Sequence, residues 1–166
     1  MNRLFSYYKS QLRYIVLLFP GSFFRRFRNV AWRSAGYKIH ITANIMPSAA
    51  LVFGEIKIGS NTYIGDDVMI TGGSITIGSS CDIAPKVLIH AGSHKAGSSF
   101  RRAGKAYAGK IEIGNGTWIG SGVIIIEGAI IGNGCVVAAG SLVKRGEYPD
   151  NSLIAGNPAS IIKYYP

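Results

Sequence analysis

Two histidines, His90 and His94, border a stretch of the chain that is rich in glycine, alanine and serine. This stretch, residues 95–110, carries Arg101, Arg102 and Lys105 between the lysines at its two ends. Neutral imidazole accepts a proton readily near pH 7, and guanidinium groups bind phosphates and carboxylates. The residue types therefore predict a general base beside a segment that suits a diphosphate or an acidic glycan. His94 is the first candidate for the base, and His90 is the second candidate or a substrate contact.

The residues on either side of this stretch repeat with a period of six. In the longest run the recurring aliphatic residues are Ile113, Ile119, Ile125, Ile131, Val137 and Val143. A small or β-branched residue follows four places after most of them. An α-helix would repeat every 3.6 residues and a simple strand every two, whereas a period of six is typical of a parallel β-helix. In that fold each hexapeptide is one short strand and one corner.

The same period extends backwards, with occasional steps of seven. The earlier aliphatic positions are Ile39, Ile45, Leu51, Ile58, Ile64, Ile70, Ile77, Ile83 and Ile89. We therefore predict an all-β protein in which residues 39–146 form about five three-sided coils, interrupted by a loop at 95–110. Residues 1–38 are predicted to form a helical arm, and residues 147–166 a closing segment. The period does not determine the handedness of the coil.

Four titratable residues fit this pattern. Asp66 and Asp67 follow Ile64-Gly65 at a predicted corner, where they either face solvent or accept hydrogen bonds from the hydroxyls of a substrate. Cys81 and Cys135 stand at small inward positions two coils apart, roughly 9–10 Å at sheet spacing. That separation is too large for a disulfide, so we expect two reduced core thiols in a cytoplasmic protein.

The beginning of the chain is strongly basic. The formal net charge is +10, and no acidic residue precedes Glu55. Such an arm suits an anionic partner, although nucleic acid is disfavoured because no recognised binding motif is present. Residues 3–19 have apolar residues at helical spacing, but their longest uncharged run is too short to span a bilayer, and no signal-peptide pattern follows it. Residues 1–35 could cap the first coil, contact the inner face of an anionic cytoplasmic membrane, or do both.

Several motifs resemble those of hexapeptide-repeat acyltransferases, in the sugar O-acetyltransferase branch that includes the maltose, galactoside and nodulation-factor enzymes. The motifs are GSH at 92–94, WIGSG at 118–122, AAGSLVKR at 138–145 and IAGNPASIIK at 154–163. The segment FPGSFFRRFRNVAWRSAG is similar to the arm of exopolysaccharide, colanic-acid and O-antigen acetyltransferases. The resemblance implies a left-handed β-helix, a homotrimer, and acetyl-CoA bound between subunits without a metal.

The resemblance also implies roles for individual residues. His94 matches the catalytic histidine. The implied cofactor contacts are Trp118, the backbone near Ser121, Ala139, Lys144, Arg145 and Lys163. The implied substrate contacts are Asp66, Asp67, His90, Arg101 and Arg102. Two departures stand out: Gly65-Asp66-Asp67 replaces an Asn-Phe-Asn stretch of the galactoside branch, which argues against small free sugars as acceptors, and Lys95 replaces a proline.

These features favour an acetyl-CoA-dependent O-acetyltransferase that acts on a sugar hydroxyl in bacterial surface-polysaccharide biosynthesis, by direct transfer with a histidine base. Two alternatives remain open: N-acetylation of an amino sugar nucleotide, and a non-catalytic β-helix scaffold. A zinc-dependent hydratase would need three histidine ligands per site. Only His90 and His94 are close in the sequence, so this class is disfavoured.

Overall fold

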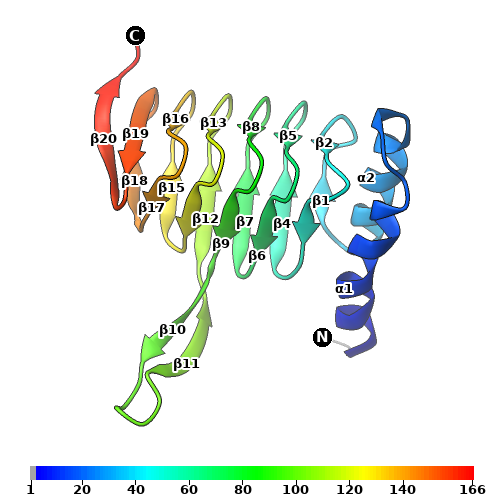
Figure 1. Cartoon of the computed structure of the whole chain (residues 1–166), viewed down its shortest axis with the longest axis horizontal. Coiled ribbons are helices and arrows are strands. Elements are labelled where there is room, and N and C mark those ends of the chain that lie inside the picture. Colours follow the sequence, from blue (N-terminus) through cyan, green and yellow to red (C-terminus); the bar gives the residue numbers. More distant parts are fainter. Residues whose placement is uncertain (1–2) are drawn as a thin grey trace.

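Three parallel β-sheets form the faces of a prism in the computed structural model, which describes residues 3–166 (Figure 1). Residues 1–2, at the start of the predicted arm, lie outside this range. Sheet A consists of β1 (Lys38–Ile39), β4 (Glu55–Ile58), β7 (Ser74–Ile77), β12 (Lys110–Ile113), β15 (Ala129–Ile131) and β18 (Gly146–Tyr148). Sheet B consists of β2 (Asn44–Ile45), β5 (Tyr63–Ile64), β8 (Asp82–Ile83), β13 (Trp118–Ile119), β16 (Val136–Val137), β19 (Ser152–Gly156) and β20 (Ala159–Tyr164). Sheet C consists of β3 (Ala50–Leu51), β6 (Met69–Thr71), β9 (Leu88–His90), β14 (Ile124–Ile126) and β17 (Leu142–Val143).

The chain passes from sheet A to sheet B to sheet C in each coil. Residues 38–143 form five complete coils, and β18 with β19 begins a sixth. The predicted parallel β-helix of about five coils is therefore confirmed. The coil is left-handed, an exception to the right-handed preference of parallel crossovers. Strand β20 turns back antiparallel to β19 and covers the C-terminal end of the prism.

The repeated aliphatic residues are the core, as their period predicts. Ile58 pairs with Ile39 on one side and with Ile77 on the other, and all three are at most 4% exposed. Each buried aliphatic side chain contributes about 1.5–3 kcal/mol relative to an exposed one. Cys81 and Cys135 are buried free thiols beside β8 and β16, and β13 separates these two strands, so the expected two-coil spacing is observed.

Two α-helices precede the prism in residues 3–34. They are α1 (Arg3–Leu17) and α2 (Arg25–Ser34), joined through a short 3₁₀-helix at Ser22–Phe24. Helix α2 covers the open end of the first coil, where Trp32 is fully buried. The Asn29 side-chain amide donates to the carbonyl of Ala43 at 2.7 Å, and Arg28 donates to the carbonyl of Ile45 at 3.2 Å. These bonds satisfy exposed backbone carbonyls at the end of the coil.

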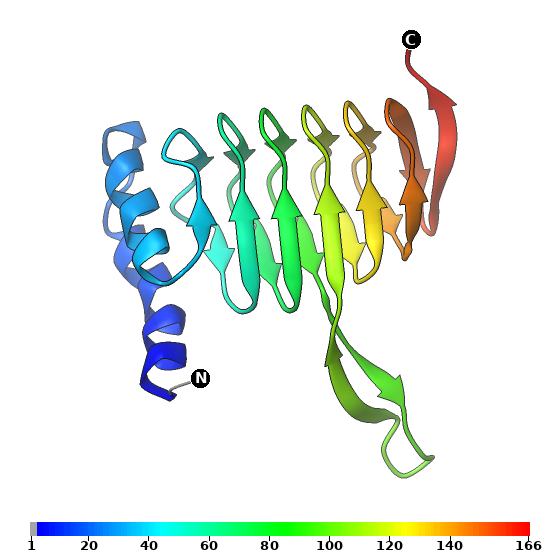
Figure 2. The same ribbon diagram turned by 180° about the vertical axis from the view of Figure 1, so that it is seen from behind.

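A hairpin projects from the prism between the third and fourth coils, and we call it the arm (Figure 2). Its strands are β10 (Gly92–Ala96) and β11 (Ala103–Ala108), which pair antiparallel. We expected a loop from Lys95 to Lys110. The insertion instead begins at Gly92 and is a regular ribbon, and Lys110 already belongs to sheet A. Small residues allow this close backbone pairing, which the period of six does not reveal.

Candidate functional site

Two edges of the prism, on either side of sheet C, carry most of the predicted site residues. At edge CA each sheet C strand leads into the next sheet A strand, and this edge carries the arm and Arg145. At edge BC each sheet B strand leads into a sheet C strand, and this edge carries Asp66, Ser121 and Ala139. The two edges are separated by a strand and its corner residues, roughly 15 Å.

His94 is exposed on the arm, close to edge CA. Its Nδ1 lies 2.9 Å from the carbonyl oxygen of Gly104 on the opposite strand. A carbonyl can only accept a hydrogen bond, so in the neutral imidazole Nδ1 carries the proton and Nε2 is the basic nitrogen. The arm thereby fixes the tautomer that a general base requires. His90 lies in β9, half-buried beside Gly92, and is less accessible than His94.

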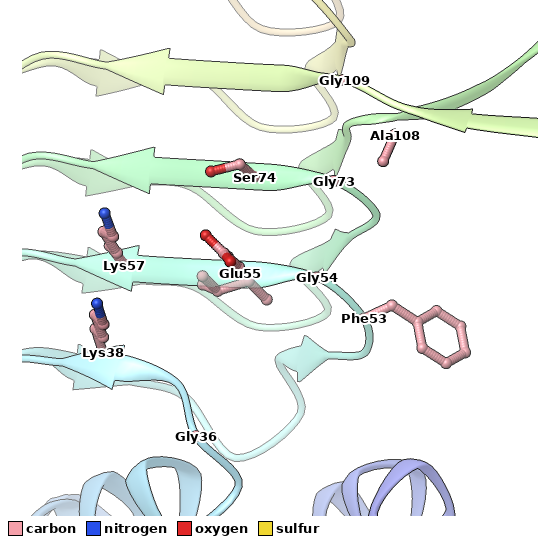
Figure 3. A pocket seen from close by; sticks show the side chains of 11 residues that line it. Gly36, Lys38, Phe53, Gly54, Glu55, Lys57, Gly73, Ser74, Ala108 and Gly109 are labelled. Carbon is pink, nitrogen blue, oxygen red and sulfur yellow. The ribbon is translucent and has the colours of Figure 1, made fainter. Parts of the chain in front are cut away.

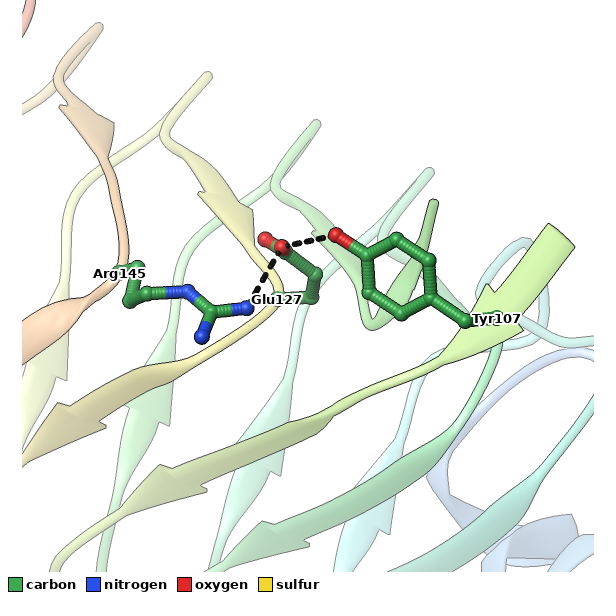
Figure 4. Close-up of polar contacts among 3 residues, drawn as sticks. All are labelled: Tyr107, Glu127 and Arg145. Carbon is green, nitrogen blue, oxygen red and sulfur yellow. Dashed lines mark hydrogen bonds and ion pairs between the residues drawn. The ribbon is translucent and has the colours of Figure 1, made fainter. Parts of the chain in front are cut away.

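The two faces of the arm differ in what they contact. Gly92 pairs with Ala108 and His94 with Ala106, whereas Ser93 pairs with Tyr107 in between. Because successive side chains of a strand point to opposite faces, His94 and Ala108 share one face and Tyr107 lies on the other. The Tyr107 hydroxyl donates a 2.6 Å hydrogen bond to Glu127 Oε1 (Figure 4). This contact ties the base of the arm to edge CA.

Glu127 is a residue that the sequence did not single out. It is only 9% exposed and also accepts a 3.0 Å hydrogen bond from Arg145. The bond from Tyr107, followed by the bond from Arg145, lowers the pKa of the Glu127 carboxyl below its ordinary value. The Glu127–Arg145 ion pair in turn raises the pKa of the Arg145 guanidinium, so both groups are charged near neutral pH. Arg145, which the resemblance assigns to the cofactor, thus also holds this network.

The predicted residues at edge BC lie in the corner segments of successive coils, which stack on one another along the prism. The Asp66 carboxylate accepts a 2.7 Å hydrogen bond from Ser48 Oγ, and Ser48 Oγ in turn accepts a 3.1 Å hydrogen bond from the Asp67 N–H. These bonds link two successive corners. Ser121 and Ala139 are exposed one coil apart, and the Ser121 N–H makes no hydrogen bond within the described residues.

The remaining predicted residues are more scattered. Trp118 is 55% exposed on sheet B, and Lys163 lies on β20 with its ammonium 4.9 Å from the ring centroid of Tyr165. Arg101 and Arg102 are exposed at the tip of the arm, away from the prism. Lys144 is exposed at edge CA beside Arg145. A single chain therefore places His94, Lys144 and Arg145 along the same edge of the prism, whereas Ser121 lies on the other edge. In residues 3–166 we find no cluster of three or more potential metal ligands.

A cleft of about 650 Å³ lies on sheet A at the foot of the arm (Figure 3). Ala108 and Gly109 of the arm border it on one side, and Gly36 lies at the other end. Lys38 and Lys57 stand on neighbouring strands within it. The period of six does not predict this cleft, because its residues come from three different coils and from the arm.

Comparisons with known proteins agree with this architecture. Residues 110–145 match the family described as bacterial transferase hexapeptide (six repeats). No curated protein sequence matches the chain significantly. A hexapeptide-repeat acetyltransferase from Vibrio cholerae is similar in structure, with a TM-score of 0.78 and 29% identity over 98% of this chain and 93% of that chain. The same Vibrio protein has been solved with acetyl-CoA, and this complex gives a TM-score of 0.76.

Two further solved structures are similar. A maltose O-acetyltransferase from Clostridium difficile has a TM-score of 0.75 and 24% identity over 98% of this chain and 89% of that chain. The polySia-specific acetyltransferase NeuO has a TM-score of 0.64 and 29% identity over 77% of this chain and 56% of that chain. The repeats and the fold together place the chain among the left-handed β-helix proteins of the hexapeptide-repeat class. Within that class it is an acyltransferase, as the sequence motifs predicted.

Proposed function

We propose that the chain is an acetyl-CoA-dependent O-acetyltransferase acting on a sugar hydroxyl in bacterial surface-polysaccharide biosynthesis. The observation that carries this proposal is the exposed His94, whose Nδ1 is bound to the Gly104 carbonyl so that Nε2 can accept a proton. The solved acetyl-CoA complex of the Vibrio acetyltransferase supports the donor. The polySia-specific activity of NeuO supports a polymeric glycan as acceptor.

The proposed chemistry is direct transfer. His94 Nε2 removes the proton from the acceptor hydroxyl as its oxygen attacks the thioester carbonyl. The tetrahedral oxyanion accepts a hydrogen bond from the Ser121 N–H, which makes none within the described chain. Collapse of this intermediate breaks the carbon–sulfur bond and leaves the acetyl ester on the sugar. The protonated His94 returns its proton to the CoA thiolate, which leaves as free CoA. Neither thiol of the protein takes part, because Cys81 and Cys135 are buried.

This chemistry requires a second copy of the chain. His94 belongs to edge CA and Ser121 to edge BC, on opposite sides of sheet C. We propose that His94 of one subunit faces Ser121 of its neighbour in a homotrimer, with acetyl-CoA between them. Trp118 and Ala139 would then line the pantetheine arm, and Lys144 and Lys163 would reach the phosphates. Both lysines are exposed, as that role requires.

Donor binding can be tested without knowledge of the acceptor. A ligand that binds only the folded protein stabilises it by about 2.7 kcal/mol at 100 times its dissociation constant. We expect millimolar acetyl-CoA and free CoA both to raise the melting temperature. If neither ligand changes the melting temperature, the scaffold alternative is favoured and the acetyltransferase proposal fails.

The role of His94 is tested by His94→Ala, with His40→Ala as the matched control. The His40 imidazole bonds to Thr42 nearby in the first coil. We expect His94→Ala to lower the rate of acetyl transfer by about 10²–10⁴ and to keep the CoA-dependent stabilisation. Products that lose acetyl in mild hydroxide are esters, whereas stable products would favour the N-acetyl alternative. A His94→Ala variant that keeps most of its activity would falsify the assignment.

We also propose that the N-terminal helical segment, within residues 1–35, contacts an anionic membrane surface. Leu18 is 75% exposed and Phe23 is 90% exposed at the turn between α1 and α2, and Arg26 is exposed beside them. Apolar side chains flanked by cations bind the interface of anionic bilayers. None of the helices in the described part of the chain is long and apolar enough to cross a membrane. We expect co-sedimentation with phosphatidylglycerol vesicles but not with pure phosphatidylcholine, and Phe23→Ser should abolish it. If the wild type and Phe23→Ser sediment equally with phosphatidylglycerol vesicles, the proposed contact is refuted.

A further inference from the structure

The cleft on sheet A contains two lysines that are not neutralised by the protein. Lys38 on β1 pairs in register with Lys57 on β4, so the two side chains leave the same face of neighbouring strands (Figure 3). Both are exposed, and neither makes an ion pair within residues 3–166. Strands in a sheet are about 4.8 Å apart, and like charges directly opposite each other are destabilising. An anion between the two ammonium groups would remove this repulsion.

Nearby groups of sheet A do not compensate the positive charge of the two lysines. Thr76 is the next residue in the same row of sheet A and supplies no negative charge. Glu112 follows it, but this carboxylate is already paired with Lys110. A second recess, of about 550 Å³, shares Lys38 with the cleft and is bordered by Arg33, which adds a positive charge. Glu55 is the one acidic residue among those that line either recess, so the pair of lysines retains an excess of positive charge.

The cleft lies on the side of the arm that carries His94. Ala108 lines the cleft, and it shares a face of the arm with His94. The pairs Gly92–Ala108 and His94–Ala106 are two residues apart along the ribbon, roughly 7 Å. Strand β4 is two strand spacings from β12 at the foot of the arm, roughly 10 Å. A ligand that contacts both Lys57 and His94 is therefore an extended molecule.

Other groups in the cleft suit a sugar. Phe53 is 52% exposed at its border, where an aromatic face can pack on the apolar side of a sugar ring. Glu55 and Ser74 pair in register and face the same side, so they can exchange hydrogen bonds with sugar hydroxyls.

We infer that this cleft binds the acceptor through a negatively charged group, a uronic carboxylate or a phosphate, held between Lys38 and Lys57. The inference rests on the proposed function, because it gives the acceptor site of that reaction a substrate class. The acceptor is then an acidic glycan, or a sugar linked to a diphosphate, whose reactive hydroxyl lies toward His94.

The test measures binding of three probes by ligand-observed NMR. Trigalacturonic acid represents carboxylate glycans, UDP-glucose represents diphosphate-linked sugars, and maltotriose is the neutral control. We expect at least one acidic probe to bind more tightly than maltotriose, and its affinity to fall with added salt. The variant Lys38→Gln/Lys57→Gln should weaken that probe about tenfold, since hydrogen bonds to charged groups are the stronger ones. Lys86→Gln, an exposed lysine at edge BC, is the matched control and should bind as the wild type does.

Folding and donor binding separate this inference from the proposed function. The double variant should melt no lower than the wild type, because the substitution removes a like-charge pair. Its melting temperature should still rise with acetyl-CoA. Loss of acidic-probe binding with intact acetyl-CoA binding supports the inference, even if transfer activity is absent. The inference is overturned if no acidic probe binds the wild type, if maltotriose binds equally well, or if the double variant keeps its full affinity.

Discussion

The hydroxyl of Tyr107 can be removed without changing the shape of the arm. Tyr107→Phe keeps the ring but deletes the 2.6 Å hydrogen bond to the Glu127 carboxylate, which retains Arg145 as a partner. A hydrogen bond to a charged group contributes about 1.5–3 kcal/mol when buried. Tyr107 is only half-buried, so we expect a loss of about 1–2 kcal/mol, around the lower end of that range.

This loss should appear in the arm and not in the prism. A two-stranded hairpin is marginally stable on its own, so the arm opens locally while the coils stay folded. A loss of one to two kcal/mol corresponds to a factor of about 5–30 in an equilibrium constant. Amide hydrogen exchange in residues 92–108 should therefore accelerate by that factor, with little change in the core of sheets A, B and C. Transfer activity should also fall, because His94 lies one pair along the ribbon from Tyr107.

The matched control is Tyr164→Phe, an exposed tyrosine on β20. It should leave exchange in the arm unchanged. If the arm amides of Tyr107→Phe exchange as in the wild type, the hydrogen bond to Glu127 does not hold the arm, and the positioning argument fails. Faster exchange throughout the prism would refute it equally, because it would show that Tyr107 supports the whole fold.

Further predictions concern charge, packing and reactivity. The hydrogen bonds from Tyr107 and Arg145 lower the pKa of the Glu127 carboxyl in the folded protein. Glu127 therefore contributes to the attachment of the arm above about pH 4.5, its ordinary pKa, and this contribution is lost as the pH falls through the lowered pKa of the folded state. In the wild type, amide hydrogen exchange in the arm should accelerate in that acidic range, whereas the exchange of Glu127→Gln should show no such dependence on pH. Arg28→Ala removes a buried guanidinium that donates to the carbonyls of Phe19, Gly21 and Ile45, and we expect a loss of about 3–5 kcal/mol in urea unfolding. Burial raises the pKa of both cysteine thiols, so a thiol reagent should label them only after unfolding, and rapid labelling of the native protein would contradict their placement.

The coil could be predicted from the sequence because one physical constraint repeats along it. Each aliphatic residue that points into the prism must stack on its neighbours, so Ile58, Ile77 and Ile113 carry the same information as any other triplet. Small residues occur where two backbones meet. A Cβ atom on Gly114 would lie 2.5 Å from the backbone of Gly132, a distance that only glycine avoids. Repetition turns these local requirements into a period that a single sequence reveals.

The contacts of the site could not be predicted in the same way, because each occurs once. Glu127 is an ordinary corner residue in the repeat, and its role depends on Tyr107, which reaches it from an insertion twenty residues earlier. The register of the arm decides which of its residues share a face with His94. Lys38 and Lys57 are nineteen residues apart, one full coil, and their pairing follows only when the strand register is known. The residue types indicated acid–base and anion chemistry, but their neighbours came from the fold.

The arrangement of the two edges also constrains how the proposed enzyme can be built. Within one chain, His94 and the Ser121 N–H are separated by the width of sheet C. In the proposed reaction the base must contact the attacking hydroxyl while the N–H contacts the oxygen of the carbonyl under attack, so the two groups must lie on either side of one reacting centre. An arm that extends away from its own prism, as Figure 2 shows, cannot bring them together by folding back, because Tyr107 and Glu127 fix its base at edge CA. We propose instead that His94 meets edge BC of another copy of the chain. Catalysis therefore depends on assembly. A monomeric variant should still bind acidic sugars in the cleft of sheet A, but it should not transfer acetyl groups.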